Sequence, residues 1–399
     1  MLKLRFCRSL VCFVFLAVPA YGQDPPAAAA TEPVVMGEMR TIESEVIGET
    51  YTLRISTPPG YEEGDERHGV VYMVDAHYLF LQGAVSVRNL DASGFPSLIL
   101  VGIDTVQRNR DLTPAPAEDA RIDFPEAGGS EAFQRFLVEE LQPFIDATYR
   151  TNGVRILAGH SFGGLFVLDT LIKRPEAFQG FLVLSPSLWF NGKAHLDQLR
   201  SAPPQHPMFG RFVFFAIGDE GPRMNGPFEE LLKILGEKSP LPSRWTARHF
   251  PGDNHWEMAL TSLRAGLRQY AAPFTEVAEG ILTVEELDER YQALDRLYGI
   301  EMPRTPFSFV SLARGLEERG ETEAALDIYA VASERFPEDP LIYRIRGQKL
   351  EEASRLEDAA ALYDRAIEKF KDSPEGERLL ETFRARRQAL QARLEEGDQ

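Results

Sequence analysis

The residues best suited to chemistry are the motif Gly-His-Ser-Phe-Gly at positions 159–163. An apolar run at 156–158 precedes it and another at 165–168 follows it. This context predicts a sharp strand-to-helix turn that exposes the hydroxyl of Ser161. The amide of Phe162, at the start of the helix, would point at an oxyanion formed there. We therefore expect Ser161 to be a nucleophile and Phe162 to be an oxyanion donor.

A serine nucleophile needs a base, and the sequence offers seven histidines. Reactive groups in a parallel sheet lie beyond the carboxyl ends of its strands. His255 sits in such a place, in a turn-rich loop after an expected strand and before an expected helix. His160 is held inside the nucleophile turn, and His195 and His206 are expected in a polar loop. His255 is therefore the predicted base.

The acid that orients the base should follow the expected strand at 212–217. Asp219 and Glu220 both lie there, and the chain order Ser161, acid, His255 is the order found in enzymes whose serine lies on such a strand-to-helix turn. We favour Glu220, although the conformation of the turn decides which carboxylate faces the histidine. Beyond another strand, at 70–74, the backbone around Ala76 should supply the second oxyanion donor.

These residues need a sheet to position them, and the chain from 34 to 275 has the apolar pattern of its strands. Apolar runs at 70–74, 98–103, 181–184 and 212–217 indicate strands covered on both faces, and 51–56 and 244–250 add two more. Helices are expected from Ser130 and over 256–270. Strands alternating with helices predict an α/β fold, a mostly parallel sheet with helices on both faces.

The first 22 residues have the pattern of a cleaved signal peptide. A basic start is followed by an apolar stretch at 10–18 and by Ala20-Tyr-Gly22 as a cleavage site. The apolar stretch is short for a membrane span, and Cys12 does not lie in a lipoprotein box, so no stable membrane anchor is expected. Residues 23–33 form a Pro/Ala-rich, flexible lead-in. We expect a periplasmic or secreted protein.

Everything beyond Thr283 has helical patterning. The segments 325–336 and 359–370 align with an offset of 34 residues, the tetratricopeptide period. A capping box at 283–286 opens this region. The range 283–396 is therefore predicted to be an all-α, tetratricopeptide-like domain. It could be a stabilising appendage, or a surface for a protein partner or for self-association.

Composition and missing motifs exclude several functions. The net charge of −18, from 43 basic and 61 acidic residues, disfavours nucleic acid as a partner. The sequence lacks a phosphate loop, a dinucleotide fingerprint and a His-Glu-x-x-His zinc pair. No cofactor and no metal site are expected.

Several stretches, in order, resemble the putative-esterase family of α/β-hydrolases, in its siderophore-esterase-like branch. They are 71–80, 101–103 running into 108–114, the nucleophile motif, 184–189 and His255-Trp256. The resemblance implies an α/β-hydrolase fold, ester hydrolysis by Ser161 and His255, and oxyanion donors at Phe162 and near Ala76. One departure is Ala76 itself, where relatives usually carry glycine.

The resemblance also implies small-molecule ester substrates, either siderophore lactones or acyl esters. Arg108 and Arg110 could hold an anionic or catecholate substrate, and Tyr78 and Trp189 could line an acyl pocket. Surface salt bridges and core packing are the alternatives for these side chains.

Our leading hypothesis is an exported serine esterase that acts through an acyl-enzyme. One alternative is a periplasmic interaction protein whose tetratricopeptide module does the work beside an inactive hydrolase domain. The other is an acyltransferase.

Overall fold

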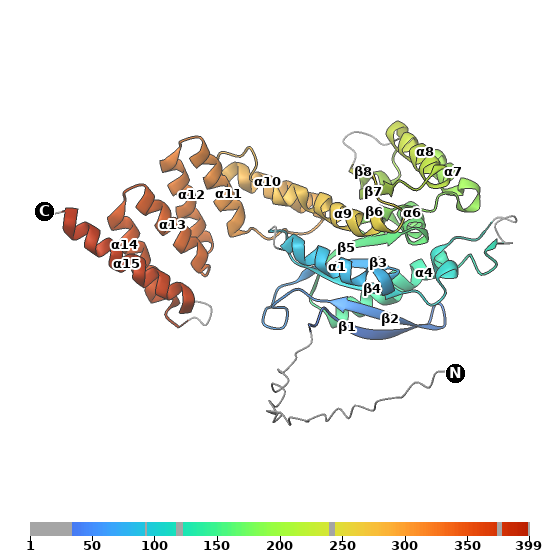
Figure 1. Cartoon of the computed structure of the whole chain (residues 1–399), viewed down its shortest axis with the longest axis horizontal. Coiled ribbons are helices and arrows are strands. Elements are labelled where there is room, and N and C mark those ends of the chain that lie inside the picture. Colours follow the sequence, from blue (N-terminus) through green and yellow to red (C-terminus); the bar gives the residue numbers. More distant parts are fainter. Residues whose placement is uncertain (1–33, 92–93, 117–122, 239–243, 373–376, 398–399) are drawn as a thin grey trace, which may run out of the picture. The chain divides into compact units, whose positions relative to one another are not determined.

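The computed structural model describes residues 34–91, 94–116, 123–238, 244–372 and 377–397 (Figure 1). The expected signal peptide 1–22 and lead-in 23–33 lie outside these residues. Within the described ranges, no helix combines the length and the apolar character needed to cross a lipid bilayer.

Eight strands form one sheet in the order β1-β2-β4-β3-β5-β6-β7-β8. They are β1 (Glu38–Ser44), β2 (Glu49–Ser56), β3 (His68–Val74), β4 (Leu98–Asp104), β5 (Thr151–His160), β6 (Gly180–Leu184), β7 (Phe212–Gly218) and β8 (Trp245–Phe250). β2 pairs antiparallel with β1 and with β4, and the other neighbours are parallel. The mostly parallel sheet is confirmed. β1 was not predicted, because its residues are largely exposed and carry no apolar alternation.

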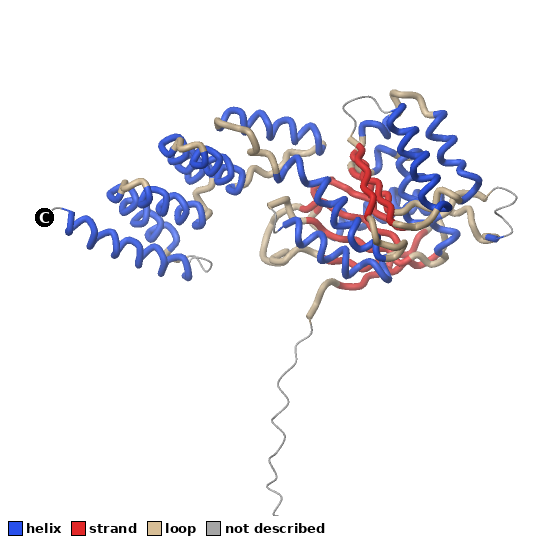
Figure 2. The backbone as a smooth tube through the Cα atoms, turned by 45° about the horizontal axis from the view of Figure 1, so that its top comes forward, coloured by secondary structure: helices blue, strands red, loops and turns tan. Residues whose placement is uncertain are grey.

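Helices cover both faces of this sheet (Figure 2). One face packs against α4 (Ser130–Arg135), a π-helical turn (Phe136–Leu141), α5 (Gln142–Thr148), α6 (Phe162–Lys173), α7 (Ala194–Ser201) and α8 (Pro222–Lys238). The other packs against α1 (Ala76–Asp91) and α9 (Glu257–Thr275). The two cores take alternate residues of β3: Tyr72 and Val74 on one side, Val71 and Met73 on the other. This alternation is why a central strand reads as a continuous apolar run.

His195 corrects one expectation. It lies in α7 rather than in a loop, and only 2% of it is exposed. Its Nε2 is 3.2 Å from Oδ1 of Asp169, a buried carboxylate that also accepts hydrogen bonds from Ser130 and Gln134. The polar sequence around His195 hid this role, because a buried hydrogen-bonded histidine and an exposed one look alike in sequence.

The chain beyond α9 is entirely helical in its described parts. It contains α10 (Val284–Tyr298), α11 (Pro306–Glu318), α12 (Thr322–Arg335), α13 (Pro340–Glu352), α14 (Leu356–Phe370) and α15 (Glu377–Gly397). The expected capping box opens α10, with Thr283 and Glu286 bonded reciprocally. α10 packs on α9, and the hydroxyl of Tyr298 donates to the carbonyl of Tyr270 at 2.7 Å. The hydrophobic core of the sheet therefore continues into the first helices of this region.

Two helix pairs of this region repeat at a fixed interval. α11 begins at Pro306 and α13 at Pro340, 34 residues later, and α12 and α14 begin with the same offset. Small residues stand at equivalent places, Ala313 in α11 and Gly347 in α13. A Cβ on Gly347 would overlap the ring of Tyr363 in α14. Close approach of paired helices thus explains why these positions are small.

Candidate active site

Ser161 lies at the sharp turn between β5 and α6. β5 ends at His160 and α6 begins at Phe162, and Ser161 between them has φ 61° and ψ −117°. A non-glycine residue rarely adopts such a φ, so the turn holds a strained backbone. A Cβ on Gly159 would overlap the carbonyl oxygen of Gly163, so the turn closes only with glycine. The motif thus forms the expected strand–turn–helix arrangement.

Two helices begin at the edge of the sheet that carries this serine. Phe162 is the first residue of α6, and Ala76 is the first residue of α1. Their strands, β5 and β3, are parallel neighbours with Met73 opposite Ala158. Both helices therefore begin at the same edge of the sheet, and the first amides of a helix have no acceptor within it. The amides of Phe162 and Ala76 are therefore both helix N-terminal donors at this edge of the sheet.

Arg108 and Tyr78 both hold Asp75, the residue before Ala76. Asp75 is fully buried with φ 59°, and its carboxylate makes a two-pronged ion pair with Arg108 at 2.8–2.9 Å. The hydroxyl of Tyr78 lies 3.4 Å from the same carboxylate. The guanidinium of Arg108 also lies 5.6 Å from the ring centre of Phe162. These contacts fix the loop that presents the Ala76 amide.

The structure does not bring Arg110 to Ser161. Its guanidinium binds Glu49 and Asp111, each at 2.7 Å, and the hydroxyl of Tyr51 at 3.3 Å. These partners lie on the side of α2 (Arg108–Leu112) that meets β2. Of the two alternatives that the sequence left open for Arg110, the structure shows the ion pairs, with Glu49 and Asp111.

His255 reaches Glu220 from the loop after β8. Nδ1 of His255 makes a short hydrogen bond with Oε2 of Glu220. The hydroxyl of Ser185 donates to the same oxygen at 2.5 Å, and the Gly218 amide donates to Oε1 at 3.0 Å. Burial alone would raise the pKa of Glu220, but these three hydrogen bonds outweigh it and hold the pKa below its usual value. Glu220 is thus a carboxylate that orients an imidazole.

Asp219 turns the other way. One oxygen of its carboxylate lies 2.8 Å from Nε2 of His249, and the other accepts from the Gly252 amide at 2.7 Å. It therefore ties the end of β7 to the loop that carries His255, without contacting that imidazole. Of the two carboxylates left open by the sequence, the structure pairs Glu220 with the histidine.

A pocket of about 370 Å³ joins these groups. Its lining includes Ser161, His255, Glu220, Trp189, Ser187 and Met224. The hydroxyl of Ser187 is 3.3 Å from that of Ser161, and Trp189 packs against the ring of Phe162 at 5.7 Å. Trp189 therefore forms part of the wall of this pocket.

His160 lies against His255 but differs from it in environment. The two ring centres are 4.4 Å apart, and His160 is fully buried. Burial, and then the neighbouring His255, lower the pKa of His160 to about 3. His160 is consequently neutral at physiological pH and adds no positive charge to the site.

Ser185 and Ser187 are site residues that sequence reasoning did not single out. Both follow β6, which is the parallel neighbour of β5. Ser185 has φ 43° and is fully buried, which fixes its hydroxyl on Glu220. The signal was available, because polar residues just past a central strand belong to the same reactive edge as the nucleophile.

Comparison with known proteins gives a consistent result. Residues 44–265 match the family model described as "Putative esterase". Ferri-bacillibactin esterase BesA of Bacillus subtilis is 36% identical over 179 residues, 39% of this chain and 59% of that protein. The siderophore enterobactin esterase of Emericella nidulans is 31% identical over 176 residues, 38% of this chain and 57% of that protein. The chain thus spans less than two thirds of the length of these relatives.

A solved structure resembles the fold over a longer stretch. The IroE-like serine hydrolase from Shewanella oneidensis superposes with a TM-score of 0.63 and 23% identity. The match covers 75% of this chain and 99% of that one. At this identity the likeness concerns the fold alone.

Proposed function

The chain belongs to the Putative esterase family, and on that premise we propose that it hydrolyses carboxylic esters with Ser161, His255 and Glu220. The observation that carries the proposal is the hydrogen bond between Glu220 and His255, in a pocket that also exposes Ser161. A carboxylate on one imidazole nitrogen leaves the other nitrogen free to take the proton of a serine hydroxyl.

The reaction follows from these positions. Ser161 attacks the ester carbonyl while His255 takes its proton, and the resulting oxyanion receives hydrogen bonds from the amides of Phe162 and Ala76. Glu220 stabilises the imidazolium that forms. His255 then returns the proton to the leaving alcohol, which leaves an acyl group on Ser161. Water, deprotonated by His255, releases the acid and restores the serine.

The substrate that we propose is a small ester, with siderophore-type lactones as the first candidates. The relatives named above are esterases of bacillibactin and enterobactin, which supports this class. Trp189 and Met224 give the pocket an apolar wall suited to an acyl or aromatic group. The alternative outcome is transfer of the acyl group to an alcohol instead of to water. Product analysis with an added alcohol distinguishes the two reactions.

Turnover of p-nitrophenyl butyrate tests the proposal. The wild type should hydrolyse it. Ser161→Ala should lower kcat by at least roughly a thousandfold, because His255 and Glu220 cannot act without the nucleophile. Equal turnover by both proteins would favour the inactive hydrolase domain instead. A panel of trilactone siderophores and simple acyl esters then ranks substrates by kcat/KM.

We also propose export and a partner-binding role for the helical region. The pattern of residues 1–22 supports a cleaved signal peptide, and N-terminal sequencing of protein from fractionated cells should find Gln23 first. The 34-residue repeat of helix pairs supports a tetratricopeptide-type array that binds a protein or a second copy of the chain. Sedimentation of the full chain over a range of concentrations tests self-association.

A further inference from the structure

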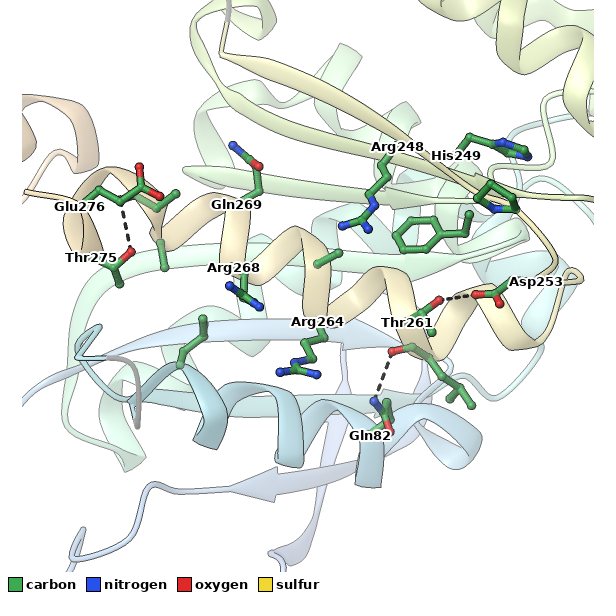
Figure 3. Close-up of a pocket in the computed structure, with 17 residues that line it drawn as sticks. Gln82, Arg248, His249, Asp253, Thr261, Arg264, Arg268, Gln269, Thr275 and Glu276 are labelled. Atoms are coloured by element: carbon green, nitrogen blue, oxygen red, sulfur yellow. Dashed lines mark hydrogen bonds between the residues drawn. The ribbon is translucent and has the colours of Figure 1, made fainter. Parts of the chain in front are cut away.

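A second and larger pocket lies between β8, α9 and α1. Its volume is about 820 Å³, and Figure 3 shows it running along α9 from Asp253 and Thr261 toward Thr275 and Glu276. Ser161, Glu220 and His255 do not line it. The volume falls in the range of small-molecule sites. Because the two pockets share no lining residue, this groove is separate from the hydrolytic pocket.

Three arginines share this groove. Arg248 reaches from β8 toward α9, while Arg264 and Arg268 come from α9 itself (Figure 3). Arg264 and Arg268 are four residues apart, which places them about 6 Å apart along the helix axis on one face. Like charges at this spacing repel each other. The free protein thus bears an electrostatic cost that a bound anion would relieve.

No carboxylate of the described chain forms an ion pair with any of these three side chains. Other arginines differ, as in the pairs Arg54–Asp104 at 2.8 Å and Arg304–Asp295 at 2.7 Å. The groove does contain carboxylates. One oxygen of Asp253 accepts from Thr261 at 2.6 Å, and Glu276 lies at the C-terminal end. Neither approaches the guanidinium groups within ion-pair distance.

The positive charge is also unusual for this molecule. The chain has a net charge of −18, so its overall field repels anions. Attraction of an anion must therefore be local to the groove. Guanidinium groups present parallel donors that match carboxylate and phosphate oxygens.

We propose that this groove binds a small organic anion with two or more carboxylate or phosphate groups. Three cations around one hollow favour a multivalent ligand over a monovalent one. The guanidinium of Arg248 stacks 4.9 Å from the ring centre of Phe250, and Leu90 and Leu260 line the same space. These apolar surfaces suit the carbon skeleton of an organic ligand. Gln269 adds a neutral hydrogen-bonding group beside the arginines.

Calorimetry with two probes, citrate and pyrophosphate, tests the proposal on the full chain. At least one should bind the wild type, and acetate should bind far more weakly. The double variant Arg264→Gln with Arg268→Gln should weaken binding at least tenfold. The matched control, Arg314→Gln with Arg384→Gln, removes the same charge from exposed positions outside the groove and should bind like the wild type.

The two probes also identify the ligand chemistry. Tighter binding of citrate supports a polycarboxylate, and tighter binding of pyrophosphate supports a phosphorylated ligand. The proposal is overturned if neither binds, or if both double variants lose the same affinity, which would mean simple charge screening. Ser161→Ala should keep full affinity, so this test stands apart from the hydrolytic activity.

Discussion

Glu220 contacts Nδ1 of His255, while the adjacent Asp219 contacts Nε2 of His249 in β8. Two consecutive carboxylates therefore have different tasks. One orients the imidazole of the active site, and the other anchors the loop that carries it.

This division predicts different kinetics for two isosteric variants. Glu220→Gln keeps the shape of the side chain but removes the charge that stabilises the imidazolium, so kcat should fall by about 100-fold or more. Asp219→Asn should stay within about threefold of the wild type, because an asparagine still offers an oxygen to the Gly252 amide and so can hold the loop in place. Steady-state kinetics on p-nitrophenyl butyrate measures both. A larger loss in the Asp219 variant would reverse the assignment of the acid.

Ser185 should act as a positioning residue for Glu220. Its buried hydroxyl donates to the carboxylate at 2.5 Å, so Ser185→Ala leaves that oxygen one donor short and frees the side chain to rotate. We expect kcat to fall roughly 10- to 100-fold with KM unchanged, since the loss of one hydrogen bond to a charged group costs about 1.5–3 kcal/mol. A change confined to KM would place Ser185 in substrate binding instead.

Some residues of this site can be predicted from the sequence, and others cannot. The nucleophile turn was predictable, because a serine flanked by Gly159 and Gly163, with an apolar run on either side, is typical of a strand-to-helix turn. The choice between Asp219 and Glu220 was not. It depends on the turn after β7, where Gly221 has φ 78° and the Asn225 side chain bonds to both Gly218 and Glu220. Hydrogen bonds within such an irregular turn leave no periodic signal in the sequence.

The fold shows the same contrast. Buried parallel strands are marked by continuous apolar runs, so β3 to β7 were foreseen. β1 was missed because it is an exposed edge strand, and the burial of His195 because its partner Asp169 lies in another helix. Arg108 and Arg110 looked equivalent in sequence, and only tertiary contacts separate them, with Asp75 for one and Glu49 for the other.

The buried Asp169 cluster predicts how stability depends on pH. Burial alone would raise the pKa of Asp169, but His195 and Lys173 together lower it below 3.8, its ordinary value. A depressed pKa means that the carboxylate stabilises the fold above pH 3.8, and that this contribution is lost as the pH falls through the folded value. Asp169→Asn should cost about 1.5–3 kcal/mol at pH 7, because it removes the charged acceptor to which the buried side chains of Ser130 and Gln134 donate.

Denaturant unfolding at pH 7 and at pH 3 measures this effect. The difference between the wild type and Asp169→Asn should shrink at the lower pH. Asp197→Asn is the control, since that carboxylate is 71% exposed in its ion pair with Arg200 and its loss should leave stability unchanged. A constant difference at both pH values would contradict the predicted titration.

Two glycines of the helical region form a matched pair. A Cβ on Gly347 would overlap the ring of Tyr363, whereas a Cβ on Gly315 in α11 meets no heavy atom within 4 Å. Gly347→Ala should therefore destabilise the chain by about 1–3 kcal/mol through overpacking. Gly315→Ala should stabilise it by about 0.5–1 kcal/mol, because alanine favours the helix. Equal effects in denaturant unfolding would show that α13 and α14 do not pack this closely.

The most direct test of the account is covalent labelling with a fluorophosphonate, read by mass spectrometry of the digested protein. Such a reagent reacts with a serine only where a base activates it beside an oxyanion site. We predict a single adduct, on the peptide that contains Ser161, which is absent in Ser161→Ala and strongly reduced in His255→Ala. An unlabelled wild-type protein, or one labelled equally in all three forms, would contradict the claim that Ser161 and His255 act together as a nucleophile and its base.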